Sequence, residues 1–377
     1  MFKGVGRTEK RKFGETGLKT SILGFGGFHL IEIPYRDVEY LLNTYLDKGG
    51  NYIETAASYG GGESELKIGR AVSGRRQEFI LASKTGERKK LGFTASLDRS
   101  LKNLNTDHLD LVLMHGVGSM EELEAILGPD GAMEGFAEAK KAGKVDFVGI
   151  SMHGAPYVLI EALHRYPFDA VMSTINYYDR FNFPDIEGTL LPLAMAKGSA
   201  VILMKPIADG LLWRSAPDAF RYAFSQPVSV VVAGINTTEM LKMDLEFAEN
   251  YEPMTDGEKD ELYKNSIELG NYVCRQCNEC RICSERIDIP GIFRLEGLFD
   301  RQMANGTVTD PAEYALRERL RFWFGNRQLA ADNYAQLDVK ADKCTKCGAC
   351  IEKCPYRIDI VRKLEMADYK LAGKKIF

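Results

Sequence analysis

The sequence predicts an α/β fold, most simply a (β/α)8 barrel, followed by a mainly α-helical domain. First, eight short apolar runs alternate with amphipathic stretches between Ser21 and about Glu249. Second, all eight cysteines lie in the last third of the chain. Third, 377 residues exceed the roughly 250 of one large barrel and leave about a hundred for a second unit. We therefore place the barrel at residues 1–260 and the helical domain at residues 261–377.

The apolar runs read as strands because they are short and are bounded by turn residues. They are Ser21–Phe28, Asn51–Ala56, Phe79–Lys84, Leu109–His115, Phe147–Ser151, Ala170–Ile175, Ala200–Lys205 and Val228–Gly234. Stretches between them carry apolar residues three and four apart, which predicts helices. Such helices are expected at Val38–Asp47, Glu63–Val72, Thr94–Leu104, Tyr157–Arg165 and Thr237–Ala248. A doubly wound sheet is the weaker alternative, since Gly24-Phe25-Gly26-Gly27 fails the G-x-G-x-x-G spacing.

The cysteines form two runs with the spacing of iron–sulfur ligands. The second run reads C-x2-C-x2-C-x3-C-P, and the first is close to it, with Ser284 where proline is usual. Because the fourth cysteine of such a run ligates the other cluster, we expect two [4Fe-4S] clusters with crossed ligands. The first would be held by Cys274, Cys277, Cys280 and Cys354, and the second by Cys344, Cys347, Cys350 and Cys283. Zinc sites are the alternative, and disulfides are less favoured because nothing marks secretion.

Charge and hydropathy argue against nucleic acid and against a membrane as partners. The net charge of −4 argues against nucleic acid. The longest apolar stretch, around Ile22 to Ile33, is interrupted by glycines, His29 and Glu32, and is too short to span a membrane. No signal-peptide pattern opens the chain. We therefore expect a cytoplasmic protein with reduced thiols.

Titratable residues stand where the predicted strands end, which is where barrel enzymes place their active sites. Glu54 ends the second strand, Tyr59 follows it, and Lys84 and His115 end the next two. A Lys84 ammonium would lower the pKa of Tyr59, and Glu54 would orient Lys84. His115 would hydrogen-bond Tyr59 or a substrate carbonyl while Tyr59 protonates the oxygen. Each residue alone also has an ordinary structural explanation, but four in this order favour chemistry.

The sequence resembles the aldo-keto reductases, which have a TIM barrel, over roughly Lys10 to Glu249. The resemblance is carried by Arg11–Leu18, Asn51–Ala56, Tyr59-Gly60, Leu81–Thr85 and Met114–Gly116. The C-terminal part resembles the ferredoxin-like domain of an iron–sulfur subgroup, and Ile287–Arg294 fits that subgroup. The resemblance implies that Tyr59, Lys84, His115 and Glu54 form a catalytic tetrad. Glu54 departs from the family, which has aspartate there, so the ion pair is expected to survive with altered geometry.

For the cofactor, the resemblance implies NAD(P)H contacts after strands five to eight. This chain matches the family at Ser151, Asn176, Pro206 and Gly210. It departs at three places where the family has asparagine, glutamine and often an aromatic residue: Met152, Met172 and Met204. A thioether cannot donate to a carboxamide. The alternative is that these are core methionines and that the amide contacts lie elsewhere.

The 2′-phosphate position also departs from the family's NADPH-dependent members, which have basic residues there. Gly234 and Met240 stand at the two places, Glu239 would repel a phosphate, and Lys242 alone is basic. The free amides of the helix starting near Thr237 would still attract an anion. We therefore predict NADH over NADPH, or a weakened dinucleotide site.

Three functions remain open, because nicotinamide moves two electrons and each cluster moves one. The first is a reductase of a small carbonyl/alcohol pair whose clusters are structural or serve an external electron carrier. The second is a cluster-fed reductase without nicotinamide, and the third is an electron-transfer or redox-sensing protein with a silent barrel. The long spacer between the cysteine runs includes a helical pattern at Pro311–Phe324, which favours the helical ferredoxin type.

Overall fold

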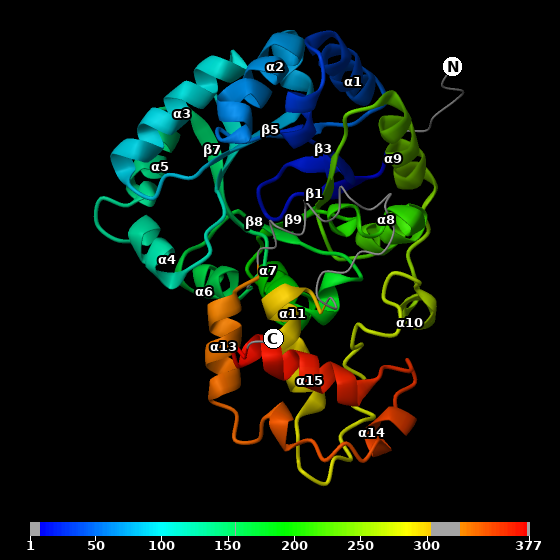
Figure 1. Cartoon of the computed structure of the whole chain (residues 1–377). Helices are drawn as coiled ribbons and strands as arrows, with labels where there is room; N and C mark the ends of the chain where they lie inside the picture. The colour runs from blue at the N-terminus through cyan, green and yellow to red at the C-terminus, as the bar shows by residue number, and fades with distance from the viewer. Residues whose placement is uncertain (1–7, 155, 303–324, 375–377) are drawn as a thin grey trace. The chain divides into compact units, whose positions relative to one another are not determined.

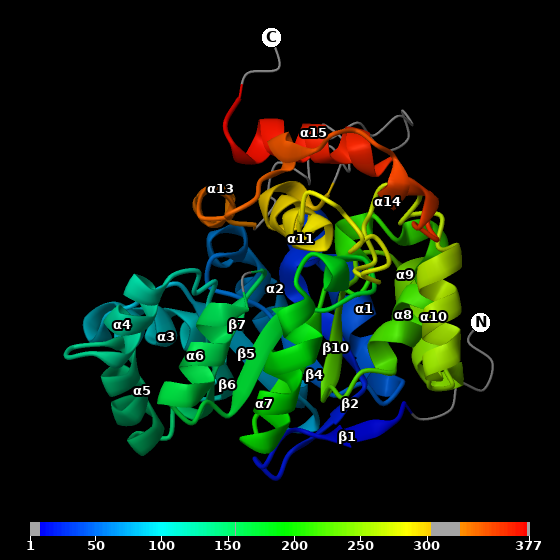
Figure 2. The same ribbon diagram turned by 90° about the horizontal axis from the view of Figure 1, so that it is seen from below.

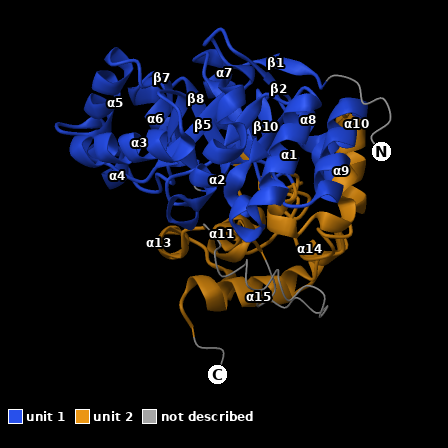
Figure 3. Ribbon diagram, turned by 90° about the horizontal axis from the view of Figure 1, so that it is seen from above, with its two compact units in different colours: residues 1–175, 185–206, 219–253 blue, residues 176–184, 207–218, 254–377 orange. Residues whose placement is uncertain are grey.

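The computed structural model describes residues 8–154, 156–302 and 325–374. The chain divides into two compact units (Figure 3). Unit 1 comprises residues 1–175, 185–206 and 219–253, and unit 2 comprises residues 176–184, 207–218 and 254–377. The division expected at residue 260 falls inside helix α10 (Asp256–Asn265). The predicted helical stretch Pro311–Phe324 lies outside the described residues.

Unit 1 is built on a closed barrel of eight parallel strands, which confirms the predicted fold class. The strands are β3 (Leu23–Gly26), β4 (Tyr52–Glu54), β5 (Ile80–Thr85), β6 (Leu109–Met114), β7 (Val145–Met152), β8 (Ala170–Thr174), β9 (Ala200–Met204) and β10 (Val230–Gly234). They pair in chain order, and β10 closes the barrel by pairing with β3, with Gly234 opposite Gly26. All eight predicted apolar runs therefore contribute a strand.

Helices surround the strands of unit 1 (Figure 1). They are α1 (Tyr35–Asp47), α2 (Glu63–Val72), α3 (Lys90–Leu104), α4 (Met120–Leu127), α5 (Ala132–Lys141), α6 (Tyr157–Arg165), α7 (Leu191–Ala196), α8 (Ala216–Phe224) and α9 (Thr238–Asn250). In α1, Val38, Leu41 and Leu42 are buried, as expected for apolar residues three and four apart. A hairpin of β1 (Lys10–Lys12) and β2 (Lys19–Ser21) was not predicted, and Phe13 in its turn joins the barrel core.

Unit 2 is mainly helical, which confirms the predicted class of the second part. Besides α10 it contains α11 (Ile289–Asp300), α13 (Arg327–Ala335), α14 (Ala349–Glu352) and α15 (Ile360–Leu371). Helix α11 packs against α13 and α15 (Figure 2). The core of this unit joins Ile292, Phe293 and Leu364 to the buried cysteines Cys274 and Cys280. Among the residues that the structure describes, no helix combines the length and apolarity needed to cross a bilayer.

Candidate active site and cysteine cavities

The four candidate catalytic residues come from three neighbouring strand ends of unit 1. Glu54 is the last residue of β4, Lys84 lies near the end of β5, and His115 directly follows β6. Lys84 Nζ donates to the Tyr59 hydroxyl at 3.0 Å and also to a carboxylate oxygen of Glu54. Glu54 and Lys84 are only 3% and 2% exposed. The structure thus brings three of the four candidates into one buried hydrogen-bonded group.

Burial and charge act in opposite directions on this group. Burial acts to lower the pKa of Lys84, but Glu54 and Tyr59 outweigh it, so that pKa is raised. Burial raises the pKa of Tyr59, which Lys84 offsets only in part, and the pKa of Glu54 is raised in the same way. Lys84 therefore acts on the phenol pKa in the expected direction, but burial outweighs it and the net shift is upward. Tyr59 remains a protonated phenol at neutral pH, ready to donate.

His115 lies beside Tyr59 without a direct hydrogen bond between them. The two ring centroids are 5.9 Å apart in an edge-to-face arrangement, and Ser58 Oγ lies 3.5 Å from His115 Nδ1. Burial, helped by the charges of Lys84 and Arg88, lowers the pKa of His115 to about 3. A neutral imidazole can donate one hydrogen bond to a carbonyl oxygen, so His115 suits orientation rather than proton donation.

Sequence reasoning missed two residues that contact this group of candidates. The Arg88 guanidinium donates to the carbonyl oxygens of His115 at 2.9 Å and Gly116 at 3.3 Å, which fixes the turn after β6. The Phe28 ring packs edge-to-face on Tyr59, with centroids 5.0 Å apart. Both follow barrel strands closely in the chain. Their position after β5 and β3 was the available signal.

These pKa shifts predict a flat pH profile for carbonyl reduction. His115 stays neutral above its lowered pKa of about 3, and Tyr59, with its raised pKa, stays protonated beyond about pH 10. We expect kcat/KM for reduction to be level between about pH 5 and 9. A steady-state profile of the wild type and of His115→Asn checks this. An inflection near pH 6.5 that disappears in His115→Asn would contradict the neutral imidazole.

Four of the candidate nucleotide contacts belong to unit 1, and two of them, Ser151 and Thr237, make side-chain hydrogen bonds within the protein. Ser151 Oγ donates to the Met114 carbonyl at 3.1 Å and accepts the Gly116 N–H at 3.2 Å, so it braces the turn that carries His115. Gly234 ends β10, and Thr237 caps α9 by accepting the Met240 N–H at 3.1 Å. Pro206 follows β9. The first-turn amides of α9 at the end of β10 suit an anion such as a dinucleotide phosphate.

The other two nucleotide candidates, Asn176 and Gly210, belong to unit 2. Asn176 Oδ1 accepts the N–H groups of Tyr178 at 3.1 Å and Asp179 at 2.8 Å, so its amide shapes the turn after β8. Gly210 has a φ of +94°, which favours glycine.

The structure also places two of the methionines that depart from the family pattern. Met172 and Met204 pack within the barrel core. Their burial there supports the alternative in which they are core residues.

The eight cysteines group around two cavities in unit 2. Cys274, Cys277, Cys280 and Cys354 line the first. Cys283, Cys344, Cys347 and Cys350 line the second. Each cavity therefore joins three cysteines of one run to the last cysteine of the other. This is the crossed grouping that the spacing predicts.

The donor chemistry of each cavity fits a [4Fe-4S] cluster, because such a cluster is held by four cysteine thiolates and four cysteines line each cavity. Within residues 8–154, 156–302 and 325–374, no three histidine, cysteine or acidic side chains form a single-ion site. Burial raises the pKa of Cys274 to about 11 and that of Cys280 to about 12, so iron would have to displace their protons.

Comparison with models of known protein families shows which family the chain belongs to. The model of the aldo/keto reductase family matches residues 22–252, more than half of the chain. The chain belongs to the aldo-keto reductase family. A model of the 4Fe-4S binding domain matches residues 337–358, which contain the second cysteine run. This aldo-keto reductase is therefore an oxidoreductase with a ferredoxin-like 4Fe-4S domain in its C-terminal part.

Individual relatives agree with this assignment. The oxidoreductase YqkF of Bacillus subtilis is 30% identical over 215 residues, 54% of this chain and 66% of that protein, which is just under two thirds. L-galactose dehydrogenase of Arabidopsis thaliana is 29% identical over 245 residues, 61% of this chain and 75% of that protein. Among solved structures, the aldo-keto reductase AKR11C1 from Bacillus halodurans aligns with a TM-score of 0.59 and 26% identity. That alignment covers 68% of this chain and 96% of the other.

Proposed function

We propose that this aldo-keto reductase interconverts a small-molecule carbonyl compound and its alcohol, with NADH as hydride donor. The observation that carries the proposal is the 3.0 Å hydrogen bond from Lys84 to Tyr59, whose phenol stays protonated beside a neutral His115. A nicotinamide, when bound, supplies hydride to the carbonyl carbon. Ser151, Asn176, Pro206, Gly210, Gly234 and Thr237 would hold the nucleotide.

The residues of this chain then perform the proton chemistry. Tyr59 transfers its hydroxyl proton to the carbonyl oxygen, and the Lys84 ammonium stabilises the phenolate that is left. Glu54 keeps Lys84 charged within the buried group. His115 donates a hydrogen bond to the same carbonyl oxygen and fixes the substrate's orientation.

The direct test is NADH oxidation by the purified protein with a panel of aldehydes and ketones, compared with Lys84→Met. We expect turnover in the wild type and a loss of at least ~10²-fold in the variant, because the Tyr59 phenolate then lacks the charge that stabilises it. Lys90→Met is a matched control, since Lys90 pairs with Glu138 at a partly exposed site. Equal turnover in wild type and Lys84→Met would contradict the assignment.

We further propose that the two cysteine cavities hold two [4Fe-4S] clusters that pass single electrons to an external carrier. We therefore expect about eight irons and eight acid-labile sulfides per chain. Iron and sulfide analysis of anaerobically purified protein, with EPR of the reduced form, checks the number. Stoichiometric zinc without sulfide would overturn the clusters, and four irons would leave one cavity without a cluster.

We propose NADH over NADPH because this chain lacks the basic residues of the 2′-phosphate position. Glu239 is exposed in the first turn of α9. The Lys242 ammonium pairs with the Glu246 carboxylate, with 3.8 Å between Nζ and Oε1. A further carboxylate stands nearby, since Glu32 accepts a 2.8 Å hydrogen bond from Asn236 in the same loop. A 2′-phosphate therefore meets negative charge here and gains no charge-assisted hydrogen bond.

Restoring a basic residue should reverse the preference. Met240→Arg is the suitable change, because a Cβ at Gly234 would lie 2.5 Å from the His29 ring. We expect NADH to bind the wild type at least as tightly as NADPH, and Met240→Arg to tighten NADPH selectively. Isothermal titration with both nucleotides measures this. A tenfold wild-type preference for NADPH, about 1.4 kcal/mol, would refute the argument, and no binding of either would favour a cluster-fed barrel.

A further inference from the structure

The two residues that follow α11 have a backbone conformation that is unfavourable for any residue with a side chain. Arg301 and Gln302 have φ values of +63° and +56°, in the left-handed region that non-glycine residues rarely adopt. Their exposures are 3% and 0%. Such a conformation persists only where surrounding contacts hold it. The contacts of these two side chains therefore show which interactions hold this unfavourable backbone conformation in place.

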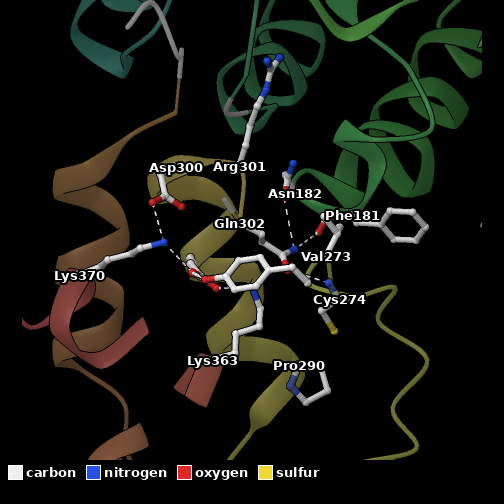
Figure 4. Close-up of polar contacts among 12 residues, drawn as sticks. Phe181, Asn182, Val273, Cys274, Pro290, Asp300, Arg301, Gln302, Lys363 and Lys370 are labelled. Atoms are coloured by element: carbon white, nitrogen blue, oxygen red, sulfur yellow. Dashed lines mark hydrogen bonds and ion pairs between the residues drawn. The ribbon is translucent and has the colours of Figure 1, made fainter. Parts of the chain in front are cut away.

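Gln302 joins a cluster-ligand position to the segment that follows β8. Its Oε1 accepts the backbone N–H of Cys274 at 2.8 Å. Its Nε2 donates to Asn182 Oδ1 at 3.3 Å and, more weakly, to the Phe181 carbonyl at 3.5 Å (Figure 4). The same amide thus contacts the first cysteine cavity on one side and residues 176–184 on the other.

Arg301 holds the same segment together with the segment that follows β9. Its guanidinium donates to both carboxylate oxygens of Asp179, at 3.1 and 3.0 Å, and to Asp209 Oδ2 at 3.0 Å. Asp179 is 1% exposed and accepts a further hydrogen bond from Asn176 Nδ2 at 3.0 Å. Residues 176–184 and 207–218 both belong to unit 2. They carry Asn176 and Gly210, two of the proposed nucleotide contacts.

We propose that Arg301 and Gln302 couple nucleotide binding energetically to the redox state of the first cluster, the one assigned to Cys274, Cys277, Cys280 and Cys354. This inference rests on the proposed function, because it takes both the cluster and the nucleotide as bound. Hydrogen bonds around the ligating cysteines are among the factors that set a cluster's potential. A nucleotide held by Asn176 acts on the segment whose Phe181 and Asn182 contact Gln302, and Gln302 in turn contacts Cys274. Cluster reduction acts back along the same contacts.

The coupling must be reciprocal, because both effects belong to one thermodynamic cycle. If reduction of the first cluster changes nucleotide affinity tenfold, saturating nucleotide shifts that cluster's one-electron midpoint potential by 59 mV. The second cluster, assigned to the other cavity, has no ligand in contact with Gln302 among the hydrogen bonds of the described residues. Its potential therefore serves as an internal reference in the same sample.

The test is an EPR-monitored redox titration of the anaerobic holoprotein with and without saturating NAD⁺, paired with calorimetric affinity for NAD⁺ in the oxidised and dithionite-reduced states. We expect one cluster to shift and the other to stay, with affinities about tenfold apart. NAD⁺ that binds both states equally overturns the coupling alone. Failure of NAD⁺ and NADH to bind in either state overturns the coupling and the nucleotide proposal together.

Gln302→Met then assigns the coupling to this side chain, because methionine keeps the length but replaces the amide with a thioether, which cannot donate and accepts only weakly. We expect the shift to collapse while nucleotide still binds. Gln328→Met is the control, since the exposed Gln328 contacts Asp332 within α13 of the same unit. A full shift in Gln302→Met overturns the assignment. If that variant fails to retain iron, the wild-type titration still decides whether coupling exists, and Asn182→Ala repeats the test from the other partner of the contact.

Discussion

Replacing Tyr59 with phenylalanine is expected to lower carbonyl reduction by at least ~10²-fold, the usual contribution of a positioned proton donor. The substitution removes the hydroxyl that accepts the 3.0 Å hydrogen bond from Lys84. It keeps the ring, so the edge-to-face contacts with Phe28 and His115 persist. The loss should therefore fall on kcat, with nucleotide affinity little changed. Steady-state kinetics with NADH and calorimetry with NAD⁺ separate the two effects.

Tyr157→Phe provides the matched control in the same unit. The Tyr157 hydroxyl donates a long hydrogen bond of 3.4 Å to the Gly118 carbonyl oxygen, and Tyr157 is 39% exposed. We expect that variant to keep wild-type turnover. Unaltered turnover in Tyr59→Phe would show that Tyr59 is not the proton donor. It would favour the alternative of an electron-transfer or redox-sensing protein whose barrel is catalytically silent.

Replacing Glu296 with glutamine is expected to destabilise unit 2 by about 3–5 kcal/mol, the cost of leaving a buried charge without its partner. Glu296 is 0% exposed and pairs with Lys363 and Lys370, each at 2.7 Å. The Tyr272 hydroxyl also donates to it at 2.9 Å, and the Lys363 ammonium lies 3.5 Å from the centre of the Tyr272 ring. Lys363 is itself 1% exposed, so water cannot replace the lost carboxylate.

The measurement is anaerobic urea unfolding followed through cluster absorbance and far-UV circular dichroism. Glu365→Gln makes the same chemical change in an ion pair with Lys346, whose side chains are 44% and 64% exposed. Exposed pairs contribute little, so its midpoint should stay near that of the wild type. Equal midpoints for the two variants would show that the Glu296 network does not hold the unit together.

The barrel could be predicted because periodicity is local. Each strand is a short apolar run, and the residues that end it, such as Glu54 and Lys84, can be read without knowing what they contact. The grouping of the cysteines around two cavities was predictable for a similar reason, since the spacing within each run indicates which cysteines lie together. The hairpin that brings Phe13 into the core was missed, because its strands have only three residues each and no apolar alternation.

Effects that depend on burial and on distant partners could not be predicted. The net rise in the pKa of Tyr59 follows from burial outweighing Lys84, and the sequence shows the charge but not the burial. Arg301 lay outside every motif, although it pairs with Asp179, 122 positions earlier. For the same reason, nothing in residues 176–184 or 207–218 indicated that they belong to the second unit.

The pairing of Asp179 with Arg301 has a consequence for synthesis. All eight barrel strands have been translated once residue 234 is made, yet the carboxylate of Asp179 must wait for a guanidinium 122 residues downstream. From residue 235 to residue 301 the ribosome adds 67 residues, which at about 5–20 residues per second takes roughly 3 to 13 seconds. Throughout this interval, the segments after β8 and β9 lack the cation that later holds both. A nascent chain that stalls between residues 234 and 301 therefore carries a complete set of barrel strands with two segments unsupported.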